Sequence, residues 1–127
     1  MDDQNTSSIK SAISVEIAAA KQAGRTAVEC GLRVNLAEAL WIENKFTESV
    51  MQYNAALGLA HSLGDDDKAG MIYAGKAFAL LHVGEHIDAV VRCYEKSLAI
   101  ADRLGNPTQV AFVKGMIANA RSQWQRR

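Results

Sequence analysis

The chain has 127 residues, of which 49% are hydrophobic and 22% are charged, a composition typical of a globular protein and not of a disordered one. Its 14 basic and 14 acidic residues give a net charge of zero at pH 7, so no global charge draws the chain to nucleic acid or to a membrane surface. The two cysteines, Cys30 and Cys93, stand far apart, which excludes a disulfide framework and a cysteine-based zinc site.

The first predicted helix covers residues 7–24. Ser7 or Ser8 can cap its start, and Gly24 ends it. Its apolar side chains recur every three or four positions and form one stripe: Ile9, Ile13, Ile17 and Ala20. Residues 1–6 are acidic and polar, so we expect them to be disordered or to serve as a cap.

Two further helices are predicted within residues 26–64. The first begins at Thr26 and ends at the polar segment 43–45. Its buried face is expected to contain Leu32, Leu36, Leu40 and Trp41. The second runs to Gly64, and its apolar residues are Phe46, Val50, Tyr53, Leu57 and Ala60. Because each stripe covers only one side of its helix, we expect the two helices to pack on each other.

Residues 67–105 repeat this arrangement. Three aspartates at positions 65–67 precede a helix that ends at Gly84, and carboxylates there favour the positive end of a helix. We interpret them as capping residues and not as a metal site, because three consecutive residues cannot all point inward. The next helix runs up to Gly105 and carries Ile87, Val90, Val91, Tyr94, Leu98 and Ala101 as its apolar stripe.

The last predicted helix covers residues 108–125, with Pro107 near its start. Its apolar residues are Val110, Val113, Ile117, Ala120 and Trp124, with Phe112 and Met116 widening the stripe. The stripe spans about 160° of the helix, which is wider than the face that one neighbour covers. We therefore expect a second copy, a partner protein or a return of the chain to shield the surplus.

Gly24, Gly64 and Gly105 end similar segments at spacings of 40 and 41 residues. A self-similar period of this length is typical of a helical solenoid, in which helix pairs stack on their neighbours. The expected fold class is therefore all-α, with about six helices in a single domain over residues 1–127. Two helix pairs, 26–64 and 67–105, are flanked by one half-repeat helix at each end.

The segments 35–41, 44–50 and 53–57 form a pattern that residues 72–106 share. This pattern resembles the tetratricopeptide repeat family, in the long variant of about 40 residues per unit that occurs in cell-polarity adaptors and kinesin light chains. The resemblance implies a right-handed superhelix of antiparallel helix pairs. It also implies a non-enzymatic adaptor or assembly subunit.

Small residues such as Ala56 and Ala77 stand where the paired helices are expected to touch, and they would let the two backbones approach closely. Tyr53 and Tyr94 would fill the gap beside them, with their hydroxyl groups reaching toward solvent.

In tetratricopeptide arrays the first helix of each pair lines a concave groove, which would here hold a peptide or an amphipathic helix of a protein partner. Carried over position by position, the partner-binding residues are Val34, Asn35, Glu38, Trp41, Phe78, Leu81, His82, Phe112 and Asn119. For Trp41, Phe78 and Phe112, a place in the core is the alternative to an anchor in the groove.

The basic end of the chain offers an alternative function. No acidic residue follows Asp102, so every charged residue after it is basic. Cations are favourable at a helix C-terminus, but this basic strip would also suit an acidic partner. A C-terminal interface of Met116, Arg121 and Trp124 would make the chain a homodimer or larger homo-oligomer, or a structural component of a large cytoskeletal or ciliary complex. Nucleic acid is not the expected partner, because Trp124 and three arginines are too few for that assignment.

No arrangement of residues predicts catalysis. His82 and His86 have the spacing of two metal ligands on one helix, but Gly84 between them marks a turn. No nucleophile has a recognisable activating partner. We therefore expect no enzyme activity, no metal and no other cofactor. The N-terminus has no apolar stretch of signal or membrane-spanning length, which favours a cytoplasmic protein without membrane contact.

Overall fold

The computed structural model describes residues 2–126, and the side chains of residues 8–126. The described residues form six α-helices and no strand. The helices are α1 (Asp2–Gln22), α2 (Thr26–Ile42), α3 (Phe46–Leu63), α4 (Asp66–Val83), α5 (Ile87–Arg103) and α6 (Pro107–Gln125). The predicted all-α class is confirmed, and α2 to α6 begin and end within two residues of their predicted bounds.

Helix α1 begins at Asp2, whereas the sequence pattern places its start at residue 7 and leaves residues 1–6 as a disordered or capping segment. The proposed caps, Ser7 and Ser8, therefore lie inside the helix. The reason is that neither glycine nor proline occurs between Asp2 and Gln22, so nothing interrupts the helical hydrogen bonds. Met1 lies outside the described residues.

The turns between the helices contain glycines at helix ends and side chains that cap helix starts. Four glycines follow helices with φ between 66° and 93°, namely Gly24, Gly64, Gly84 and Gly105. This is the left-handed region that a residue without Cβ adopts at low cost. Asp65 accepts a hydrogen bond of 3.0 Å from the backbone N–H of Lys68, and Asn106 accepts one of 3.1 Å from that of Gln109. The first aspartate of the run therefore caps α4, and Pro107 occupies the first turn of α6.

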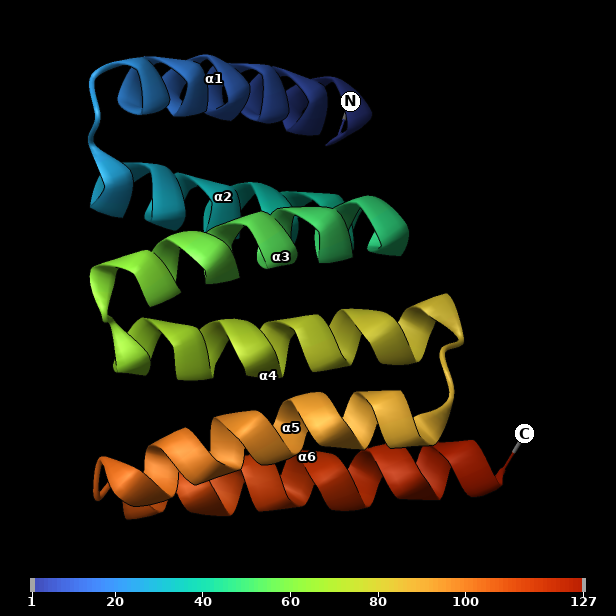
Figure 1. Ribbon diagram of the computed structural model, residues 1–127. Helices are drawn as coiled ribbons and strands as arrows, with labels where there is room; N and C mark the ends of the chain where they lie inside the picture. Colours follow the sequence, from blue (N-terminus) through green and yellow to red (C-terminus); the bar gives the residue numbers. More distant parts are fainter. Residues whose placement is uncertain (1, 127) are drawn as a thin grey trace. The chain divides into compact units, whose positions relative to one another are not determined.

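The chain divides into two compact units, Met1–Gly64 and Asp65–Arg127. In the first unit α2 packs against α1 and α3, and in the second α5 packs against α4 and α6. Figure 1 shows that successive helices within each unit run in opposite directions. Between α1 and α2 the buried apolar side chains are Ile17, Leu36 and Leu40. The single domain expected for residues 1–127 stays a prediction.

Small residues let α2 and α3 approach closely. Ala37, Ala56 and Ala60 are fully buried. Ser49 Oγ donates a hydrogen bond of 2.7 Å to the carbonyl oxygen of Ala37, and Cys30 Sγ donates one of 3.4 Å to that of Ala56. Because each bond joins the helices at a different level, together they set the antiparallel register of the pair.

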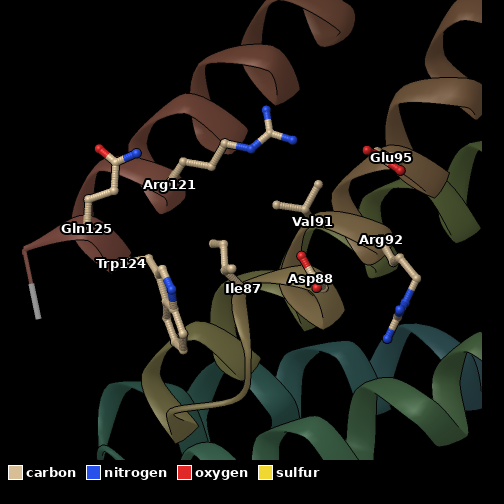
Figure 2. Close-up of a pocket in the computed structure, with 8 residues that line it drawn as sticks. All are labelled: Ile87, Asp88, Val91, Arg92, Glu95, Arg121, Trp124 and Gln125. Carbon is tan, nitrogen blue, oxygen red and sulfur yellow. The ribbon is translucent and has the colours of Figure 1, made fainter.

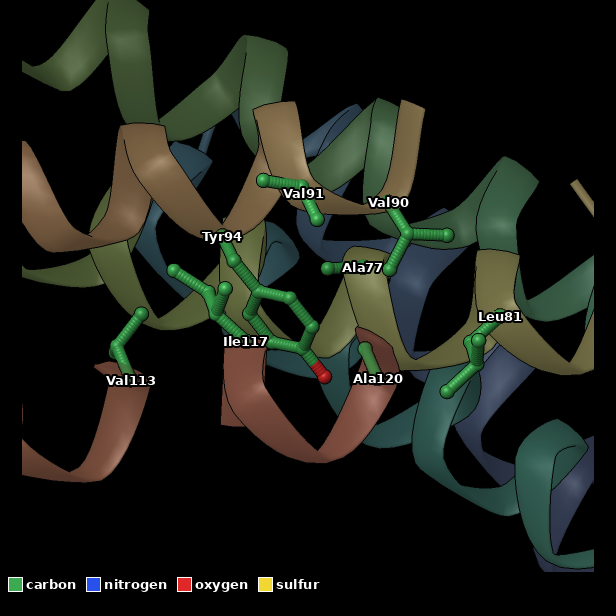
Figure 3. Close-up of a cluster of buried hydrophobic side chains, with 8 residues drawn as sticks. All are labelled: Ala77, Leu81, Val90, Val91, Tyr94, Val113, Ile117 and Ala120. Atoms are coloured by element: carbon green, nitrogen blue, oxygen red, sulfur yellow. The ribbon is translucent and has the colours of Figure 1, made fainter. Parts of the chain in front are cut away.

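The second unit has a core to which all three of its helices contribute, as Figure 3 shows. Its buried members are Ala77, Leu81, Val90, Val91, Tyr94, Val113, Ile117 and Ala120. Beside this core, Ser97 Oγ donates a hydrogen bond of 2.8 Å to the carbonyl oxygen of Gly70. A Cβ atom at Gly70 would lie 3.1 Å from Ile100 Cγ2, so the close approach of α4 and α5 favours glycine at this position.

Tyr94 lies deeper than the sequence suggests. Its side chain is fully buried, and its hydroxyl group has no hydrogen-bond partner among the described residues. The expectation that this hydroxyl reaches solvent is wrong, because Val113, Ile117 and Ala120 of α6 pack in the same cluster. Burial raises the pKa of Tyr94 to about 12, and burial with a smaller contribution from Glu38 raises that of Tyr53 to about 12.

Candidate protein-binding surfaces

The predicted partner-binding residues of the first unit lie on α2. Asn35 and Glu38 are exposed, and Val34 and Trp41 are half-buried. Val34 and Asn35 lie four and three residues before Glu38, and Trp41 lies three residues after it, so the four positions fall on one side of the helix. The Trp41 ring meets that of Phe46 edge to face, with centroids 6.4 Å apart. Trp41 therefore lies against the first residue of α3, with its indole Nε1 buried.

The predicted residues on α4 are of two kinds. Phe78 is half-buried and His82 is exposed. Their rings are in contact, with centroids 4.6 Å apart, and His82 Nδ1 lies 2.9 Å from the carbonyl oxygen of Phe78. Leu81, by contrast, is 3% exposed and belongs to the core of the second unit. Its side chain is therefore not accessible to a partner.

Most of the wide apolar arc of α6 is covered within the second unit. Val113, Ile117 and Ala120 are buried, and Met116 packs partly buried against the same core. Phe112 is the large apolar side chain of α6 that stays exposed, at 54%. Asn119, a further predicted binding residue, is exposed as well. The uncovered apolar surface that the sequence predicts for α6 is thus small and is centred on the ring of Phe112.

Helices α5 and α6 line an open pocket of about 510 Å³, shown in Figure 2. Its lining residues are Ile87, Asp88, Val91, Arg92 and Glu95 from α5, and Arg121, Trp124 and Gln125 from α6. Ile87, Val91 and the Trp124 ring are its apolar part, and the other five side chains are polar or charged. In Figure 2 the side chain of Arg121 extends from α6 toward α5. The pocket thus offers an aromatic wall together with charges of both signs.

His86 holds Trp124 at this pocket. The two rings meet edge to face with centroids 5.0 Å apart. His86 also caps α5, because its Nδ1 accepts a hydrogen bond of 3.2 Å from the backbone N–H of Asp88. The turn before α5 therefore positions the far end of α6.

Of the predicted C-terminal interface, Arg121 and Trp124 meet in this pocket, whereas Met116 lies against the core. The α5 side of the pocket was missed in the sequence. A signal existed there, because Ile87, Val91 and Glu95 recur at intervals of four residues and so share one side of a helix.

A second open pocket, of about 620 Å³, lies in the first unit among α1, α2 and α3. Leu36, Leu40 and Met51 are its apolar lining residues, and no predicted partner-binding residue lines it. Lys10 at this pocket donates a hydrogen bond of 2.7 Å to Glu43 Oε2. This bond raises the pKa of Lys10 and lowers the pKa of Glu43, because it favours the charged form of both groups.

Within the described residues, no group of three or more His, Cys, Asp or Glu side chains is arranged to hold a metal ion. None of the helices there combines the length and the apolar character needed to cross a membrane. Neither the comparison with protein-family models nor the comparison with curated proteins finds a match. The resemblance to tetratricopeptide repeats therefore stays a prediction from the sequence.

Proposed function

We propose that the chain is a non-enzymatic, tetratricopeptide-like protein-binding module, an adaptor or assembly subunit that holds a peptide or an amphipathic helix of another protein. One observation carries this proposal: none of the three predicted aromatic anchors is among the buried residues. Trp41 and Phe78 are half-buried, and Phe112 is more than half exposed. Apolar side chains fixed on helices can bury partner surface at little cost in ordering the binding site.

On each unit, polar neighbours of these anchors would orient a ligand. Asn35 and Glu38 on α2, His82 on α4 and Asn119 on α6 are all exposed. A few polar groups beside apolar anchors are what fixes the direction and register of a bound segment. The ligand expected from this mixture is a helix with apolar residues three and four positions apart.

A cytoplasmic location is part of the proposal. Cys30 and Cys93 carry reduced thiols, and reduced cysteines suit a reducing compartment.

Selection from a displayed library of random peptides tests the proposal without a known partner. We expect enriched peptides with apolar residues at helical spacing. Peptides that bind the first unit should bind Trp41→Ala more weakly, and peptides that bind the second unit should bind Phe78→Ala more weakly. Enrichment of acidic peptides whose binding falls steeply with salt, and does not respond to either substitution, would contradict the proposal and assign binding to the basic strip.

A second candidate function is self-assembly, as a homo-oligomer or a structural component that makes contact through the C-terminal helix. The observation that favours it is the pocket in which Arg121 and Trp124 meet α5. Light scattering over a wide concentration range should then show a mass that rises with concentration and falls in Arg121→Glu. A monomer at all concentrations would exclude this function.

A further inference from the structure

Helix α6 lies on α5 in the manner of a helical ligand in a groove. Its contact residues recur three or four positions apart: Val113, Ile117 and Ala120 are buried, and Trp124 is half-buried. This spacing is the one by which amphipathic helices are recognised in protein grooves. On its other side, residues such as Phe112 and Asn119 are exposed. One stripe therefore holds α6 in place.

The surface beneath α6 contains an unsatisfied polar atom. Tyr94 of α5 is 0% exposed, and its hydroxyl group has no hydrogen-bond partner among the described residues. In Figure 3 this hydroxyl points toward α6, on the side of Ala120. The methyl group of Ala120 cannot accept a hydrogen bond. Docking of α6 therefore removes the hydroxyl from water without replacing the hydrogen bonds that it loses.

We infer that the surface of α5 beneath α6 is a helix-binding site, which α6 occupies with an imperfect match and from which an amphipathic helix of a partner protein displaces it. The partner helix has the apolar spacing of α6 and carries a hydrogen-bond acceptor, such as a serine or asparagine side chain, at the position of Ala120. The inference rests on the proposed function, since it names a protein ligand, but it concerns a different surface. A second copy fits less well, because its α6 would bring the same alanine.

Amide hydrogen exchange in the intact chain measures the opening of α6. The amides of α6 should exchange before those of α4 and α5. Tyr94→Phe keeps the ring and removes the hydroxyl, so α6 exchange should slow about tenfold. Ala120→Ser should slow it in the wild-type chain and leave it unchanged in the Tyr94→Phe chain. Exchange of all three helices in one step, or additive effects of the two substitutions, would overturn the inference.

Two labelled synthetic peptides spanning residues 106–126 test displacement directly. One has the native sequence and the other carries Ala120→Ser. Both should bind the full chain weakly, because the tethered α6 competes at a high effective concentration. The serine peptide should bind about tenfold more tightly, and this ratio should fall to near one with the Tyr94→Phe chain.

No binding, equal binding of the two peptides, or a preference that survives Tyr94→Phe would overturn the inference. Trp41→Ala is the matched control, because it weakens ligands of the anchors on the first unit and should leave the ratio between the two peptides unchanged. Failure of this inference can therefore be told apart from failure of the proposed function.

Discussion

The helix pairs α2–α3 and α4–α5 meet the same packing requirement with different residues. Cys30 and Gly70 are equivalent, each five positions after the N-cap residue of its helix. In the first pair the Cys30 thiol donates to the carbonyl of Ala56 on α3, whereas in the second pair the hydroxyl of Ser97 on α5 donates to the carbonyl of Gly70. The donor thus lies on the first helix of one pair and on the second helix of the other, while the two helices approach closely in both pairs. A helix crossing of this kind needs small residues and a side-chain donor, but no particular amino acid.

The two pairs also differ in buried charge. Glu29 on α2 is 7% exposed and accepts a hydrogen bond of 2.8 Å from Arg33, which donates another of 3.0 Å to Gln52. The equivalent positions on α4 hold Ala69, which is buried, and Tyr73. The first unit thus carries an ion pair where the second carries a buried alanine and a tyrosine ring whose centroid lies 5.4 Å from Lys96 Nζ. The following substitutions measure how much each arrangement contributes to stability.

Loss of Arg33 should have the largest effect. Arg33→Met leaves the Glu29 carboxylate largely buried without its partner, so the free energy of unfolding should fall by about 3 kcal/mol. The double substitution Glu29→Ala with Arg33→Tyr copies the second unit and should recover most of this loss, because no buried charge remains. Urea denaturation measures both variants. A double variant less stable than Arg33→Met would show that the ion pair is not interchangeable with apolar packing.

Overpacking of the crossings should come next. Ala56→Leu places a larger side chain at a position that is 0% exposed. The free energy of unfolding should therefore fall by about 2 kcal/mol. Ser97→Leu at the equivalent position should cost at least as much, because it also removes a hydrogen bond. Ala99→Leu on the exposed side of α5 is the control. Equal stability of Ala56→Leu and this control would disprove the close approach of α2 and α3.

Removing single donors should have smaller effects. Ser97→Ala and Ser49→Ala each delete one buried hydrogen bond, and each should lower the free energy of unfolding by about 1 kcal/mol. Ser62→Ala removes an exposed hydrogen bond to the carbonyl of Leu59 and should change stability by much less. Unchanged stability of either variant would contradict the burial of the hydrogen bond that it removes.

Alkaline titration should give the smallest difference between the units. Tyr53 and Tyr94 stand at equivalent positions, and burial raises the pKa of each from 10.0 to about 12. A raised pKa in the folded state contributes stability that is complete below pH 10 and is lost as the pH rises through about 12. Ultraviolet absorbance should show both tyrosines ionising late, and the variant with both changed to phenylalanine should lose less stability over this range. Ionisation of either tyrosine near pH 10 in the folded chain would contradict its burial.

Local sequence signals made the helices predictable. Features that depend on contacts between helices could not be predicted from the sequence. Gly64 and Gly105 mark helix ends by their own backbone requirements, so they are readable without the fold. The burial of the Tyr94 hydroxyl depends on which residues of α6 lie over it, and periodicity does not contain that information. The same holds for the pocket, because the sequence suggests Arg121 and Trp124 but not the level at which α5 meets them.

Calorimetric titration of a selected peptide into the wild-type chain and into the variant with both Trp41→Ala and Phe78→Ala tests the proposed function most directly. Binding should be lost in the double variant, with its helical circular dichroism and unfolding transition retained, and the wild-type affinity should change little with salt, because apolar burial supplies it. Unchanged affinity in a folded double variant, or loss of folding together with loss of binding, would contradict the assignment of these rings as partner anchors.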